Sequence, residues 1–231
     1  MRSLTWQLLS LSIIRARVNY EVGDFQEGGV YLEMALETVG STHPGPTLEH
    51  ASLALMVPVI ARISGETARL ELAESSGLAV VSSTSSLPLF KLIARAGLGL
   101  LAVLRDDAFA ARAAYASLKP ARSINWIISF GSIHRLLGLL AQTSGEPDKA
   151  AEHFEDALAF CRKAGYRPEL AWTCCDYADM LLDPSTSSAR AGEGHRAKAM
   201  SLLDESLAIS SELGMRPLME RVLSRREILG A

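Results

Sequence analysis

Apolar residues recur at helical spacing along most of the chain. In residues 147–164, five small or apolar side chains fall on one face of a helix, and they are Ala150, Phe154, Ala157, Leu158 and Cys161. Pro147 suits the first helical turn, and Gly165 can take the left-handed conformation that closes a helix. These signals predict an amphipathic helix, with Phe154 as its large buried side chain. The run before it, residues 126–142, has the same periodicity and predicts a second helix.

Turn signals separate such helical runs at regular intervals. They lie at Gly23, Gly65, Asp106, Gly145 and Gly194, which are 42, 41, 39 and 49 residues apart. This spacing predicts five helix–turn–helix pairs followed by a final helix over residues 217–229, with no β-sheet. The longer last interval contains residues 183–194, which are rich in Ser, Gly and Pro and predict a loop insertion of about nine residues. We expect one all-α domain over residues 1–231, an α-α superhelix in which each pair packs on its neighbours.

The chain also repeats itself in sequence. The segment GEPDKAAEHFEDALAFCRKAGYRP, residues 145–168, returns 49 residues later as GHRAKAMSLLDESLAISSELGMRP, residues 194–217. The stretch LGLLAQTSGEPDKAAEHFEDAL resembles a tetratricopeptide repeat (TPR), with Gly138, Ala150 and Ala157 as the small residues that let two helices approach. The second pair, residues 48–81, fits poorly. Pro58 should interrupt its first helix and Glu74 stands at a large apolar position, so we expect a kink or a divergent pair.

The repeat period is longer than the 34 residues of a standard TPR. Long helices that end in G-x-R-P resemble the C-terminal region of bacterial signalling ATPases linked to class III adenylate or guanylate cyclase domains or to LuxR-type regulators. The resemblance implies a right-handed helical array that binds a peptide or partner domain on its concave face. The chain has no Walker A motif, cyclase carboxylate pair or helix-turn-helix reader, so catalysis and DNA binding are not implied.

Composition narrows the class of protein. A net charge of −3 gives no positive field for nucleic acid. Residues 1–20 are apolar in part, but polar residues interrupt them and Arg15 and Arg17 end the run, which predicts an amphipathic helix rather than a membrane span. Three cysteines without metal-type spacing favour reduced thiols in a cytoplasmic protein.

Few residues suggest chemistry. His153 lies beside Glu152 and Glu155, but their side chains point in different directions on a helix, which favours a solvated face over a metal site. His134 is interpreted as a partly buried structural histidine rather than a catalytic base. Cys174 and Cys175 are expected to be core thiols rather than nucleophiles. We therefore expect no enzyme activity, no cofactor and no metal.

Candidate ligand-binding residues follow from the repeat pattern, which places them on the concave face. They are Arg17, Tyr20, Arg135, Leu139, Gln142, Trp172 and Asp179. Arg135 and Trp172 should face the same side from neighbouring first helices, where a guanidinium and an indole could grip a peptide. Ordinary solvent-exposed surface is the alternative for each residue. The expected function is a non-enzymatic protein-interaction module of a bacterial signalling protein. The alternative is a small-molecule effector sensor that regulates an attached ATPase, cyclase or transcription regulator.

Overall fold

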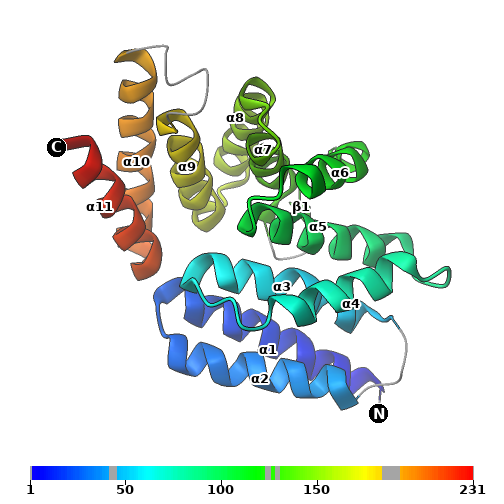
Figure 1. Ribbon diagram of the computed structural model, residues 1–231. Coiled ribbons are helices and arrows are strands. Elements are labelled where there is room, and N and C mark those ends of the chain that lie inside the picture. Colours follow the sequence, from blue (N-terminus) through cyan, green and yellow to red (C-terminus); the bar gives the residue numbers. More distant parts are fainter. Residues whose placement is uncertain (1, 42–45, 123–125, 128–130, 184–192, 231) are drawn as a thin grey trace. The chain divides into compact units, whose positions relative to one another are not determined.

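The computed structural model describes residues 2–41, 46–122, 126–127, 131–183 and 193–230. Within them the chain is almost wholly helical and forms two compact units, residues 1–106 and 107–231 (Figure 1). We call them the N-terminal and C-terminal units and describe each by itself. The expectation of one continuous array stays a prediction.

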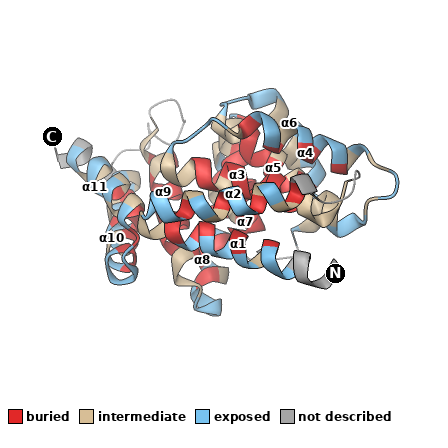
Figure 2. Ribbon diagram, turned by 90° about the horizontal axis from the view of Figure 1, so that it is seen from below, coloured by how far each residue is buried: buried red, intermediate tan, exposed pale blue. Residues whose placement is uncertain are grey.

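The N-terminal unit consists of five helices. They are α1 (Arg2–Val22), α2 (Phe25–Ser41), α3 (Leu48–Ser64), α4 (Leu70–Ser82) and α5 (Pro88–Leu104). Each helix packs on its successor in the chain through most of the unit, and α3 also packs on α1 and α5. The helix α3 therefore lies at the centre of the core of this unit, and most of its residues are buried (Figure 2).

The C-terminal unit continues the same packing order. Its helices are α6 (Ala108–Leu118), η1 (Lys119–Ala121), α7 (Ile133–Thr143), α8 (Pro147–Ala164), α9 (Arg167–Leu182), α10 (Glu193–Leu213) and α11 (Arg216–Gly230). Successive helices from α6 to α11 are in contact, and α9 also contacts both α7 and α11. Asp107 caps the N-terminus of α6, because its side chain accepts hydrogen bonds from the backbone amides of Phe109 and Ala110.

Four of the five expected turns are confirmed. Gly23, Gly65, Asp106 and Gly145 separate consecutive helices and have positive φ angles of 80°, 78°, 52° and 77°. Glycine adopts this left-handed conformation without a steric penalty, which explains its use at three of the four positions. Gly194 itself is the second residue of α10, and the fifth turn, expected near it, stays a prediction. Most of the expected insertion, residues 184–192, lies outside the described residues.

The side chain of Phe154 is fully buried, as its helical position predicts. Its ring stacks on Tyr177 with centroids 5.3 Å apart. A Cβ at Gly138 would lie 3.1 Å from the Phe154 ring, so any larger residue there would require the ring to shift. The final helix, expected over residues 217–229, is present as α11.

The second helix pair corrects one expectation. The helix α3 runs through Pro58 without interruption, and Pro58 itself is buried. Packing of α3 against α1, α4 and α5 therefore outweighs the hydrogen bond that proline cannot donate. Glu74 is only half-buried, and its carboxylate accepts two hydrogen bonds from Arg105, at 2.9 and 2.8 Å. The surface position of Glu74 explains why this pair tolerates a charge there.

The helices α3 and α5 approach at backbone distance. A Cβ built on Gly97 of α5 would overlap the carbonyl group of Ala54 in α3. Only glycine can occupy this position without moving one helix away from the other.

The run of residues 126–142 was wrongly expected to be one helix. Its beginning instead forms two strands, β1 (Trp126–Ile127) and β2 (Gly131–Ser132), which pair antiparallel, and α7 starts only at Ile133. The carboxylate of Glu169 in α9 accepts a hydrogen bond from the Ser132 amide at 2.8 Å. Gly131 has a φ of 140°, and a Cβ there would lie 2.9 Å from the Glu169 carboxylate. A distant carboxylate thus holds this segment extended, which local periodicity does not reveal. Across the described residues, none of the helices is both long and apolar enough to cross a lipid bilayer.

Candidate functional site

The candidate ligand-binding residues are divided between the two units. Arg17 and Tyr20 belong to α1 in the N-terminal unit, whereas the other five belong to α7 and α9 in the C-terminal unit. Four of them are buried, namely Arg17, Tyr20, Leu139 and Trp172. The remaining three are half-buried, namely Arg135, Gln142 and Asp179. Their role in binding stays a prediction.

Arg135 forms a buried ion network with carboxylates of α9. Its Nε donates to Asp176 Oδ2 at 2.8 Å, and its Nη1 donates to Glu169 Oε2 at 3.1 Å. The side chains of Glu169 and Asp176 are 1% and 0% exposed, and that of Arg135 only 13%. The guanidinium therefore compensates two carboxylates that have almost no access to water.

The helix α11 extends this network. Arg221 donates to Asp179 Oδ2 at 2.6 Å and lies 3.5 Å from Asp176 Oδ1, and Arg225 donates to Asp179 Oδ1 at 2.7 Å. Burial opposes the charge of Arg221, but Asp176, Cys175 and Asp179 together raise its pKa above the ordinary value. Three arginines and three carboxylates thus connect α7, α9 and α11.

Trp172 lies close to two guanidinium groups of this network. The indole is 5.5 Å from the Arg135 guanidinium carbon and 5.9 Å from that of Arg221. Arg135 and Trp172 contact each other, whereas the repeat pattern predicted that both would face a ligand on the concave side. Their contacts are internal, however, and the indole is only 3% exposed.

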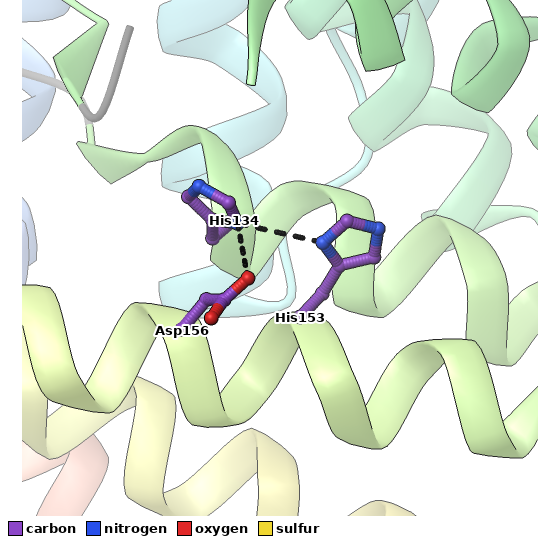
Figure 3. A group of neighbouring side chains, drawn as sticks. All are labelled: His134, His153 and Asp156. Atoms are coloured by element: carbon purple, nitrogen blue, oxygen red, sulfur yellow. Dashed lines mark hydrogen bonds and ion pairs between the residues drawn. The ribbon is translucent and has the colours of Figure 1, made fainter. Parts of the chain in front are cut away.

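A second cluster joins α7 and α8 and contains His134, His153 and Asp156 (Figure 3). The Nδ1 atoms of the two histidines are 3.4 Å apart, and His134 Nδ1 is 3.4 Å from Asp156 Oδ2. Both histidines are 9% exposed. The Asp156 side chain is 63% exposed, so one side of the cluster is open to solvent.

The outer nitrogen of each imidazole also has a partner. His134 Nε2 is 3.0 Å from the carbonyl oxygen of Arg122, and His153 Nε2 is 2.9 Å from the hydroxyl of Tyr115 in α6. Burial, followed by the nearby His134, lowers the pKa of His153 and favours its neutral form.

His134 is a buried, hydrogen-bonded histidine, as expected. His153 was wrongly assigned to a solvated face, because its Tyr115 and His134 contacts come from other helices. Its acidic neighbour is Asp156, three residues along the same face of α8, rather than Glu152 or Glu155. That three-residue spacing was the signal in the sequence that could have suggested the pair.

All three cysteines of the chain are buried and unbridged. Burial raises the pKa of the Cys161 thiol to about 12, and it also raises that of Cys174. A thiol with a raised pKa is a poor nucleophile at neutral pH. The expectation of core thiols for Cys174 and Cys175 is confirmed.

The first helix carries an exposed apolar stripe that the sequence reasoning missed. Its members are Leu8, Leu11, Ile14 and Val18, which are 56%, 61%, 48% and 50% exposed. Their spacing of three, three and four residues puts them on one face of α1. The opposite face carries the buried side chains Leu9, Ile13, Ala16 and Tyr20. The helix α1 is thus apolar on two faces, but only one of them packs within the unit.

No family model, no curated protein and no solved structure matches this chain.

Proposed function

We propose that this chain is a non-catalytic protein-interaction module built as a TPR-like helical array. It binds an amphipathic helix of a partner protein on the α1 stripe, defined as Leu8, Leu11, Ile14 and Val18. The observation that carries this proposal is the exposure of four large apolar side chains along one helix face. Contiguous apolar surface of this kind in a folded protein is typical of protein-binding sites.

The dimensions of the stripe favour a helix as its occupant. Leu8 to Val18 covers eleven residues, whose ten rises of 1.5 Å give about 15 Å of helix axis. Three turns of an amphipathic helix cover this length with apolar anchors at positions i, i+3 and i+7. The buried face of α1 is already covered in the same way by helices of its own unit.

The charge beside the stripe indicates the partner's polarity. The neighbouring helix α2 contains Glu27, Glu33 and Glu37 and no lysine or arginine. All three glutamates are exposed, although Arg15 pairs with Glu27 and Arg69 with Glu33. We therefore propose a helix with basic residues along the edge that faces α2, because complementary charge speeds association and fixes orientation.

The order of helix contacts supports the TPR-like assignment. In the N-terminal unit α3 contacts α1 and α5, and in the C-terminal unit α9 contacts α7 and α11, so alternate helices pack together as well as successive ones. A repeated helix pair produces this pattern, since the first helices of adjacent pairs lie side by side. By the same resemblance, the module acts within a bacterial signalling protein.

Site-specific photo-crosslinking tests the function. A benzoylphenylalanine replaces Leu11 in cells that express the chain, and the crosslinked segment is identified by mass spectrometry. The matched control carries the same probe at Phe109 of α6, which is 84% exposed but isolated from the stripe in sequence. We expect a specific product from position 11 that maps to a basic amphipathic helix.

The identified segment is then synthesised and its affinity is measured by calorimetry. Leu11→Asp should weaken binding about 30-fold, which corresponds to about 2 kcal/mol, with an unchanged melting temperature. Phe109→Asp should leave the affinity unchanged. Equal crosslinking from both positions would refute the proposal. Crosslinking only to a second copy of the chain would also refute it and would show that the stripe is a homodimer interface.

A further inference from the structure

We propose that His134, His153 and Asp156 form a binding site for a divalent transition-metal ion of the Zn²⁺ class. The three residues offer two imidazole nitrogens and one carboxylate oxygen, all within 4.8 Å of one another (Figure 3). The site is separate from the α1 stripe and does not depend on the proposed function.

The distances match those that zinc imposes on its ligands. Two atoms that each lie about 2.05 Å from a tetrahedral zinc ion are about 3.3 Å apart. The His134 Nδ1 to His153 Nδ1 and the His134 Nδ1 to Asp156 Oδ2 separations are both 3.4 Å. The third separation is within 4.8 Å, and rotation of the exposed Asp156 side chain can shorten it. Two of the three separations therefore already match those of a tetrahedral zinc site.

The hydrogen bonds of the outer nitrogens direct both Nδ1 atoms toward the site. A carbonyl oxygen only accepts, so His134 Nε2 must carry the proton that is donated to Arg122 O. Neutral His134 then presents a bare Nδ1 lone pair toward His153 and Asp156. A backbone carbonyl that accepts from the outer nitrogen is a common partner of metal-bound histidine.

Tyr115 allows His153 to bind without releasing a proton to solvent. Without a metal, His153 Nδ1 donates to the bare His134 Nδ1, and His153 Nε2 accepts from the Tyr115 hydroxyl. When a metal takes the His153 Nδ1 lone pair, the proton resides on Nε2 instead. The Tyr115 oxygen can then accept that hydrogen bond, because a phenol serves as donor or acceptor. Tyr115 is thus a positioning residue for the metal ligand.

The ligand set selects the class of metal. Ca²⁺ and Mg²⁺ prefer sites made wholly of oxygen, whereas imidazole suits Zn²⁺, Ni²⁺ and Cu²⁺. Two histidines and one carboxylate leave the fourth tetrahedral position to water or a ligand from solution. The exposure of Asp156 gives that position access to solvent.

The test uses the full chain without an affinity tag, freed of metal by a chelator and titrated with Zn²⁺ in a calorimeter. We expect one tightly bound ion per chain, and Co²⁺ in its place should give the intense visible absorption of a tetrahedral site. Asp156→Asn should weaken Zn²⁺ binding at least tenfold, and Tyr115→Phe about tenfold. The matched control Glu152→Gln alters an exposed carboxylate four residues earlier on the same helix and should leave the affinity unchanged.

Histidine ¹⁵N chemical shifts of the unaltered chain provide a readout that needs no variant. On addition of Zn²⁺ the Nδ1 signals of His134 and His153 should shift together, while His134 Nε2 stays protonated and His153 Nε2 becomes protonated. A shift at His50 or His195 instead, equal affinity of Asp156→Asn and Glu152→Gln, or an octahedral Co²⁺ spectrum would each overturn the proposal.

Discussion

Replacing Arg135 with alanine removes the cation at the centre of the buried ion network. Glu169 would then lose the 3.1 Å hydrogen bond and Asp176 the 2.8 Å hydrogen bond that the guanidinium donates. Both carboxylates would remain almost inaccessible to water. We therefore expect Arg135→Ala to lower the free energy of unfolding of the C-terminal unit.

The expected loss is about 3–5 kcal/mol, the range for removing one partner of a buried ion pair. A solvent-exposed ion pair contributes at most about 1 kcal/mol. Arg162→Ala is the matched control, because Arg162 also pairs with a carboxylate through two nitrogens, but its side chain is 49% exposed. Its loss should stay within about 1 kcal/mol.

Urea denaturation measures both losses. Trp172 fluorescence reports on the C-terminal unit if Trp6 and Trp126 are first replaced with phenylalanine, since the chain has three tryptophans. Adding Glu169→Gln to Arg135→Ala should recover part of the loss, because it removes one uncompensated charge and keeps an oxygen for the Ser132 amide. Equal losses for Arg135→Ala and Arg162→Ala would refute the reasoning. If Arg135→Ala abolished binding of a ligand without lowering stability, Arg135 would be a ligand-binding residue, as the repeat pattern predicts, rather than a residue that stabilises the fold.

Three further predictions concern packing. In thermal melts, Gly97→Ala should destabilise the N-terminal unit by about 3 kcal/mol, because its methyl group would overlap the Ala54 carbonyl. Gly29→Ala should instead stabilise the unit by about 0.5–1 kcal/mol, because a Cβ there meets only the Tyr20 hydroxyl, at 3.9 Å. Phe154→Ala should cost about 3–5 kcal/mol and His153→Ala about 1–3 kcal/mol in the same urea assay, and a negligible effect of His153→Ala would restore its solvated assignment. Ellman's reagent should modify none of the three buried thiols in the native chain and all three in urea, and rapid reaction of any one before unfolding would contradict the burial of the cysteines.

Helix periods and turn residues predicted the features that depend on neighbouring sequence. The turns at Gly23 and Gly145 need only a residue that tolerates positive φ, and the buried position of Phe154 follows from the period of α8. Such features are encoded within about one helix pair. They account for the all-helical fold and for four of its turns.

The errors arose where a distant side chain determines the local structure. Ser132 is held extended by Glu169, which lies 37 residues further along the chain. His153 is buried by Tyr115 and His134, from two other helices. Periodicity within a helix cannot reveal these partners, so it predicted neither the strand pair nor the histidine cluster. The α1 stripe was missed for a different reason. The sequence shows that α1 is apolar on two faces, but only the packing shows which face is buried and which is exposed.

The close approach of α3 and α5 compensates for the proline within α3. Pro58 has no amide hydrogen, so the carbonyl oxygen four residues earlier, that of Ala54, cannot receive the usual helix hydrogen bond from it. That carbonyl is the group a Cβ of Gly97 would overlap, so a hydrogen on the Gly97 α-carbon points toward it. A Cα–H···O contact can therefore partly satisfy the acceptor that the proline leaves free. The residues at positions 58 and 97 therefore depend on each other. An amide hydrogen at position 58 would make the contact dispensable. A side chain at position 97 would separate the helices and leave the Ala54 carbonyl without this contact.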